Sequence, residues 1–203
     1  MSATLRPDLM TIADLVNPES RVLDVGCGEG ELLAWLAAHK QVDGRGIELA
    51  QARVHQAIAR GISVIQGDGE ADLADYPSGA YDYAILSMTL QAMKDPRRVV
   101  AELTRVGKQA IISVPNFGHW KNRFYFSLMG RMPVTSTLSY EWYDTPNIHF
   151  CTISDFVILC ERMGIVIERR IMVDTTGQRS GFSGRGPWAN LFGQQGVFLL
   201  RAR

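Results

Sequence analysis

The sequence of 203 residues predicts an α/β fold, with one domain built on a doubly wound sheet that helices cover on both faces. Three observations predict this class. Short apolar runs alternate with stretches of helical periodicity between residues 6 and 115. The runs are nearly continuous, as expected of parallel strands that are buried on both faces. A turn with three glycines follows the first run, within 26–30.

Five strands and four helices are expected in this first part of the chain. The expected strands are 21–25, 44–49, 62–67, 81–88 and 108–114, and the expected helices are 6–16, 31–40, 50–61 and 95–107. The first helix is predicted by the helical spacing of Leu9, Ile12 and Val16. Asp95 and Pro96 provide start signals for the last helix, and Gly107 provides its stop signal.

The alternation breaks after Pro115. Residues 116–151, here called the insertion, hold nine of the 18 aromatic residues of the chain, and a short helix is expected at 120–130. Disordered linkers are poor in aromatic residues, so we expect the insertion to be packed on something. A helix at 152–164 and a strand at 165–173 follow. The remaining segments are a flexible loop rich in glycine and serine at 174–187 and a last strand at 196–203.

The composition excludes several classes of protein. The 21 basic and 21 acidic residues balance, so the chain has no electrostatic footprint for nucleic acid. Cys27, Cys151 and Cys160 lack paired spacing, and the four histidines are scattered, so we expect reduced thiols and no metal site. Neither a signal peptide nor an apolar run of membrane-spanning length is present, so we expect a cytoplasmic protein without a membrane partner.

The glycine motif indicates which ligand the first turn can hold. Asp24 precedes Gly26, Gly28 and Gly30 in the pattern D-x-G-x-G-x-G. A dinucleotide site would need its third glycine at position 31, which is Glu31, and a glutamate there repels a pyrophosphate. An acidic turn suits a ligand that carries an ammonium and a sulfonium. NAD is therefore disfavoured, although Asp24 by itself could equally be a solvated loop carboxylate.

Two more acids follow strand ends and fit the same ligand. Glu48 ends the second strand, where a carboxylate can accept hydrogen bonds from both ribose hydroxyls, and Asp68 follows the third, near an adenine amino group. The combination resembles the class I S-adenosylmethionine-dependent methyltransferases. That resemblance implies a Rossmann-like sheet with a reversed C-terminal strand. It also implies that S-adenosylmethionine or S-adenosylhomocysteine is held by Asp24, Gly26, Cys27, Gly28, Glu48, Leu49, Asp68, Gly69, Ser87, Met88 and Gln91.

A methyl acceptor site has no clear signature. The loop after the fourth strand, SMTLQAM, lacks the N/D-P-P-Y pattern of enzymes that methylate amino nitrogens of bases or glutamine. Candidate catalytic groups lie in the insertion, where a histidine could act as a general base and an aspartate could orient it. The candidates are His119, Tyr143, Asp144 and His149. Alternatively, the aromatic residues form a structural cluster, or they form a partner face or acceptor pocket that includes Trp120, Arg123, Trp142 and Tyr143.

A closer resemblance covers nearly the whole chain. RVLDVGCGEGELLAWL, LSMTLQAM, SVPNFGHW, GRMPVT and WYDTPNIHFCTISDF together resemble the MetW family of methionine biosynthesis. The resemblance implies a partner or activator of homoserine O-acyltransferase (the MetX-type acetyl- or succinyltransferase), which could sense S-adenosylmethionine. The alternative is an active methyltransferase that acts on a small metabolite or on its protein partner, since a fold does not fix a function.

Overall fold

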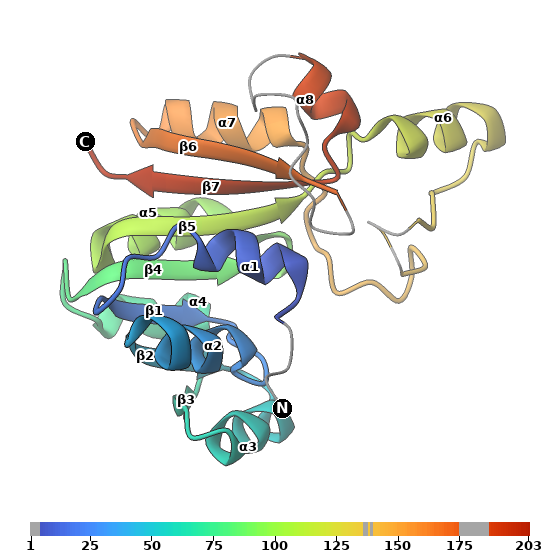
Figure 1. Cartoon of the computed structure of the whole chain (residues 1–203). Helices are drawn as coiled ribbons and strands as arrows, with labels where there is room; N and C mark the ends of the chain where they lie inside the picture. Colours follow the sequence, from blue (N-terminus) through green and yellow to red (C-terminus); the bar gives the residue numbers. More distant parts are fainter. Residues whose placement is uncertain (1–4, 136–137, 139, 175–186) are drawn as a thin grey trace.

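The computed structural model describes residues 5–135, 138, 140–174 and 187–203. Its centre is a seven-stranded sheet with helices on both faces (Figure 1). The strands are β1 (Arg21–Val25), β2 (Asp43–Glu48), β3 (Ser63–Gln66), β4 (Tyr81–Ser87), β5 (Gly107–Pro115), β6 (Val166–Val173) and β7 (Gln195–Arg201). The α-helices are α1 (Pro7–Ala13), α2 (Glu31–Lys40), α3 (Gln51–Ala59), α4 (Gly69–Asp72), α5 (Pro96–Val106), α6 (Trp120–Met129), α7 (Ile153–Arg162) and α8 (Pro187–Phe192). Two 3₁₀ helices are η1 (Leu73–Asp75) and η2 (Leu90–Ala92).

The strand order is β3-β2-β1-β4-β5-β7-β6. The first five strands along the sheet are parallel, and β7 runs antiparallel to both of its neighbours. The predicted fold class, including the reversed C-terminal strand, is therefore confirmed. Because the order turns at β1 and β4, the loops after these two strands lie at the switch point where α/β proteins bind ligands.

The core lies on both faces of the sheet, as the continuous apolar strands predict. Along each central strand, neighbouring residues belong to different clusters: Leu23 and Ile112 face one side, and Val22 and Ile111 face the other. Helices α5 and α7 cover the first side, and α1 and α2 cover the second. Each side chain buried in this way contributes roughly 1.5–3 kcal/mol. The sheet is therefore a rigid support for the loops at its edges.

The structure differs from the expected elements mainly in short helices. The first helix ends at Ala13, and α4, α8, η1 and η2 are additional. Such helices of three to six residues are too short to show a 3.6-residue period. Helix α4 begins at an N-cap, because the Asp68 side chain accepts a hydrogen bond from Glu70 N at 3.0 Å. Such a cap stabilises a short helix without giving the sequence a helical period. Most of the predicted 174–187 loop, residues 175–186, lies outside the described residues.

The insertion leaves the sheet at the carboxyl end of β5, and Figure 1 shows it extending away from that edge. Buried asparagines attach its first part to the domain. Asn116 Nδ2 donates to Asn190 O and Gly193 O at 2.7 and 2.6 Å, and Asn122 Nδ2 donates to Phe117 O at 3.1 Å. Within the described ranges, no helix has the combination of length and apolar character needed to cross a membrane.

Candidate functional site

The glycine turn connects β1 to α2 and borders open space. Gly26 and Gly28 have φ of 72° and 58°, a left-handed conformation that glycine adopts at little cost. A Cβ on Gly26 would lie 3.2 Å from Thr89 Oγ1, so the turn also packs closely against the loop after β4. A Cβ on Gly28 would meet nothing within 4 Å. The turn is therefore closed on one side and leaves room for a ligand on the other.

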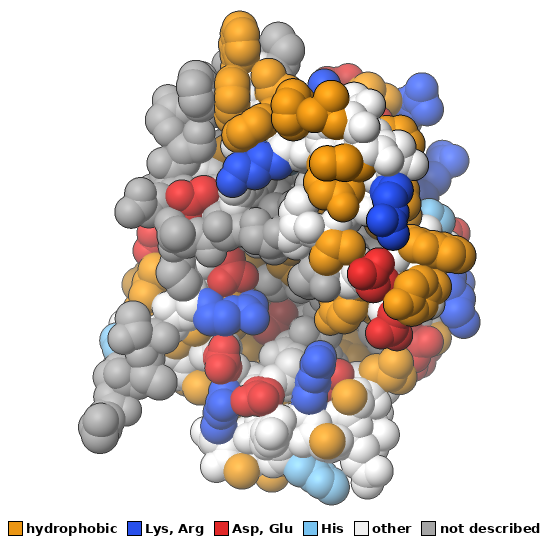
Figure 2. All heavy atoms as spheres, turned by 90° about the vertical axis from the view of Figure 1, so that its right-hand side faces the viewer, with side chains coloured by type: hydrophobic (Ala, Val, Ile, Leu, Met, Phe, Trp, Pro, Cys, Tyr) orange, Lys and Arg blue, Asp and Glu red, His pale blue; other side chains and the backbone are white. Residues whose placement is uncertain are grey.

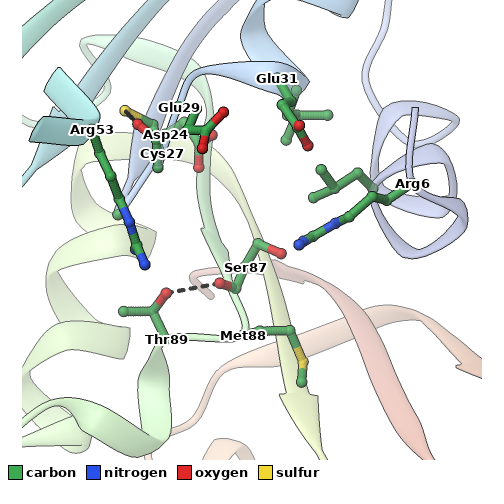
Figure 3. Close-up of a pocket in the computed structure, with 13 residues that line it drawn as sticks. Arg6, Asp24, Cys27, Glu29, Glu31, Arg53, Ser87, Met88 and Thr89 are labelled. Atoms are coloured by element: carbon green, nitrogen blue, oxygen red, sulfur yellow. Dashed lines mark hydrogen bonds between the residues drawn. The ribbon is translucent and has the colours of Figure 1, made fainter. Parts of the chain in front are cut away.

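That room is a cavity of about 340 Å³ at the carboxyl edge of β1 and β4 (Figure 3). This volume is within the range of about 300–1,000 Å³ that is typical of small-ligand sites. The residues that line the cavity come from the segment around α1, the glycine turn, the start of α2, helix α3 and the loop after β4. They are Arg6, Leu9, Asp24, Gly26, Cys27, Gly28, Glu29, Glu31, Leu32, Arg53, Ser87, Met88 and Thr89.

Asp24 is the buried acid of this cavity. Its side chain is almost completely buried, and its Oδ1 has no hydrogen-bond partner among the described residues. Burial, and secondarily the nearby Glu48 carboxylate, raise the pKa of Asp24 to about 7. A buried carboxylate without a full set of partners favours a cationic or hydrogen-bond-donating ligand beside it.

Glu48, at the end of β2, connects the glycine turn to the start of α3. Its Oε2 accepts a hydrogen bond from Gly28 N, and its Oε1 accepts one from Ala50 N, both at 2.9 Å. A carboxylate offers about four lone-pair positions, so two hydrogen bonds leave acceptor capacity on both oxygens. Glu48 therefore fixes the turn and can still bind a ligand through the same carboxylate.

Cys27 has the environment of a packing residue. Burial, together with the charges of Asp24 and Glu48, raises the pKa of the Cys27 thiol to about 12. A Cβ on Gly46 of β2 would overlap the Cys27 Sγ, so that glycine makes the space into which the thiol packs. A thiol with this pKa is protonated at neutral pH and is a poor nucleophile.

The loop after β4 is held in an unusual conformation. Met88 has a φ of 51°, which is rare for a residue other than glycine. Its backbone N donates to Ser113 Oγ at 2.9 Å, and its carbonyl accepts from Gln91 Nε2 at 2.7 Å. Thr89 Oγ1 donates to Ser87 O at 2.7 Å, the dashed line in Figure 3. These bonds fix Ser87 and Met88 at the cavity wall.

The structure brings together part of the predicted cofactor set. Asp24, Gly26, Cys27, Gly28, Ser87 and Met88 line the cavity, and Glu48 lies behind Gly28. The other four predicted residues do not line it. Leu49 is exposed, Asp68 is exposed and caps α4, Gly69 begins α4, and Gln91 is buried with its side chain bonded to Met88 O.

Sequence reasoning missed both basic residues of the cavity. Arg6 and Arg53 extend toward the loop of Ser87 and Thr89 from opposite sides (Figure 3). No periodic or motif signal indicates either arginine, because their positions depend on how α1 and α3 pack. The acids Glu29 and Glu31 belong to the glycine motif itself, and both lie near Arg60, whose Nη2 contacts Glu29 at 2.6 Å and whose Nη1 contacts Glu31 at 3.7 Å.

None of the four candidate catalytic residues lines this cavity. His119 is buried at the N-cap of α6, where its Nδ1 accepts from Lys121 N at 3.4 Å; burial, and then the charge of Lys121, lower the pKa of His119. Tyr143 and Asp144 are exposed. His149 Nε2 lies 3.3 Å from Lys94 O, and its backbone N donates to Gln91 O. The structure therefore does not assemble these four residues into one site.

The partner candidates have different environments. Among the residues that the structure describes, Trp142 and Tyr143 are the most exposed of the large aromatic residues, with 70% and 72% of their surface accessible. Their rings meet edge to face with centroids 5.6 Å apart. Trp120 is partly exposed, and Arg123 Nε donates to Gly118 O at 2.5 Å, so this arginine helps to fix the start of α6.

Solved structures define the class of fold. An S-adenosylmethionine-dependent methyltransferase of Thermotoga maritima, a possible histamine N-methyltransferase, aligns with 97% of this chain and 88% of its own, with a TM-score of 0.68 and 18% identity. The structure of the Haloferax volcanii Trm112 methyltransferase activator with a putative methyltransferase aligns with a TM-score of 0.70 at 13% identity, over 97% and 89% of the two chains. The protein therefore has the class I S-adenosylmethionine-dependent methyltransferase fold.

The family follows from the sequence. The chain belongs to the family of the methionine biosynthesis protein MetW, whose family model matches residues 6–200. It is also 35% identical over 186 residues to the bifunctional methionine biosynthesis protein MetXA/MetW of Rhodopirellula baltica. That alignment covers 87% of this chain and 30% of the relative. The chain spans between 30% and 41% of the length of the curated relatives that it matches.

Proposed function

We propose that this cytoplasmic protein binds S-adenosylmethionine in the cavity and acts as partner and activator of the MetX-type homoserine O-acyltransferase in methionine biosynthesis. The observation that carries the partner role is the bifunctional relative, in which MetXA and MetW are joined in one chain. Two proteins that are fused in one organism are placed at a high effective concentration, which suits a pair that works in contact.

The donor set of the cavity fits S-adenosylmethionine. This ligand carries an ammonium and a sulfonium, and Asp24 offers a buried carboxylate with an unpartnered oxygen. Glu48 retains acceptor capacity for the ribose hydroxyls, and the open side of Gly28 lets a ligand approach the backbone closely. Arg6 and Arg53 supply positive charge for the ligand's carboxylate. When bound, the ligand would offer an activated methyl group; the protein's part is to orient it and to exclude water.

A hydrogen-bonded path supports sensing of this ligand by the insertion. Met88 lines the cavity, and its carbonyl accepts from the Gln91 side chain at 2.7 Å. The Gln91 carbonyl in turn accepts from Ile148 N at 2.8 Å and His149 N at 3.0 Å, both in the insertion. A ligand that shifts Met88 would therefore act on the end of the insertion through one intermediate residue, Gln91. Such coupling needs the ligand to prefer one arrangement of this path over another.

Activity of the purified cognate acyltransferase tests the proposed role. We expect equimolar addition of this protein to raise the acyltransferase rate about tenfold or more, which corresponds to about 1.4 kcal/mol in the activation barrier. An equal rate with and without the protein contradicts the partner role. The same mixtures are supplied with S-adenosylmethionine labelled in its methyl group. Catalytic transfer of label to homoserine, another metabolite or the acyltransferase would favour the alternative, a methyltransferase.

A further inference from the structure

The insertion presents an unusually apolar surface beside the cavity edge. Figure 2 shows hydrophobic side chains gathered over this part of the molecule, above an area where charges of both signs lie. The exposed members include Phe124, Phe126, Leu128, Met129, Trp142 and Tyr143, each with more than half of its surface accessible. Large contiguous apolar patches on a soluble domain are typical of sites where another protein docks.

Helix α6 makes little use of its apolar residues within the domain. Of its ten residues, only Asn122 is buried, although the helix contains one tryptophan, two phenylalanines, one leucine and one methionine. An isolated helix of this length is marginally stable in water, and helices normally gain their stability by burying an apolar face. The structure therefore leaves α6 without the burial that its composition predicts.

A groove lies between the second half of α6 and the chain that follows it. It has a volume of about 500 Å³ and is lined by Tyr125, Arg131, Met132, Val134, Glu141, Trp142 and Tyr143. Tyr125 and the edge-to-face pair of Trp142 and Tyr143 supply its aromatic surface. Aromatic residues of this kind are the usual energetic centres of protein interfaces, because they bury a large area at a small entropic cost.

The groove also carries one charge of each sign. Arg131 and Glu141 both line it, and in the part of the chain that the structure describes neither side chain forms a hydrogen bond or an ion pair. Opposite charges at the margin of an apolar site give register and orientation to a partner with complementary charges. Because of these two charges, the groove can orient an extended or helical protein segment, which a uniformly apolar surface could not do.

We infer that this groove is the docking site for a segment of the acyltransferase that carries large apolar side chains flanked by an acidic and a basic residue. This rests on the proposed function. The fused relative supports this choice of occupant, because MetXA and MetW are joined there in one chain. The path from Met88 through Gln91 to Ile148 ends five residues after Tyr143, so the chain that lines the groove continues directly into the segment proposed to sense the ligand.

Binding of the purified acyltransferase, measured by calorimetry, tests the groove. The double variant Tyr125→Ala/Trp142→Ala removes two aromatic side chains and is expected to weaken binding by at least about 30-fold. Arg131→Glu/Glu141→Arg keeps the aromatic residues and exchanges the charges; it is expected to weaken binding and to increase its salt dependence. The matched control is Ile58→Ala/Ile65→Ala, in which both positions are 56% exposed on α3 and β3. We expect the control to bind as the wild type does.

Each outcome has a separate meaning. Wild-type binding that the Tyr125→Ala/Trp142→Ala variant retains overturns the groove as the docking site and leaves the proposed function standing. Failure of the wild type to bind the acyltransferase overturns the proposed function. A wild-type dimer in light scattering that the double variant converts to a monomer, without acyltransferase binding, assigns the groove to a second copy and contradicts the inference. Unchanged thermal unfolding of each variant establishes that it is folded.

Discussion

Replacing Asp24 by Asn is expected to raise the free energy of unfolding at pH 8 by up to about 4 kcal/mol. The pKa of Asp24 is about 7 in the folded protein against 3.8 ordinarily, a difference of about three units at about 1.4 kcal/mol each. Because the folded pKa is raised, the folded chain binds the proton more tightly. The wild type should therefore lose stability as pH rises from about 4 to about 7, and above pH 7 it carries the full cost of the buried charge.

Urea denaturation at several pH values between 4 and 8 measures this effect. The wild type should show a falling free energy of unfolding across the interval, and Asp24→Asn should remove that part of the slope. The matched control is Asp144→Asn, at an exposed carboxylate in the insertion, which should keep the wild-type slope. If Asp24→Asn and the wild type share one slope, Asp24 does not have the burial and the pKa described here.

Replacing Glu48 by Ala is expected to weaken the binding of S-adenosylmethionine strongly and to destabilise the fold. The substitution removes the acceptor of Gly28 N and Ala50 N, and the loss of these two partly buried hydrogen bonds should cost roughly 1–3 kcal/mol together. Part of this cost is offset, because removing Glu48 also removes a charge that raises the pKa of Asp24. Affinity for S-adenosylmethionine should fall at least about 100-fold, since both the ribose acceptor and the shape of the turn are lost.

Calorimetric titration with S-adenosylmethionine and denaturation by urea measure the two parts of this expectation. Glu48→Gln retains one oxygen acceptor, so it should fold and bind with an intermediate affinity. The control Glu161→Ala removes an exposed carboxylate on α7 and should match the wild type in both measurements. Wild-type affinity in a folded Glu48→Ala variant would place the ligand elsewhere.

Much of the fold could be predicted from the sequence because its central strands are buried on both faces. Apolar runs mark β1, β4 and β5, whereas β2 and β3 are more exposed and were predicted from the alternation of strands and helices. The glycine turn identifies the strand whose end borders the cavity. The strand β7 itself was predicted from its apolar run at 196–203, but its reversed direction was predicted only through the family resemblance. Helix α8 was missed because its six residues have no measurable period. The successful predictions thus rest on two local features of the sequence: the apolar runs of buried strands and the glycines of a turn with a left-handed backbone.

The candidate site was predicted less completely, for a physical reason. Asp24, Glu48 and the glycines belong to strand ends, where position in the chain determines position in space. Arg6 and Arg53 reach the cavity from helices that pack against the sheet, and packing of this kind is not encoded in a short motif. The aromatic residues of the insertion were expected to be packed, but the structure leaves most of them exposed, both on α6 and in the chain that follows it.

The most direct measurement is the acyltransferase rate in the presence of this protein while S-adenosylmethionine is titrated. The wild type should change the rate with a midpoint equal to the calorimetric dissociation constant of S-adenosylmethionine for the complex with the acyltransferase. That constant should differ from the one for this protein alone, because coupling between two sites changes both affinities by the same factor. Asp24→Asn should remove the response to the ligand while the protein stays folded. A rate that is the same with and without this protein, at every ligand concentration, would contradict the account.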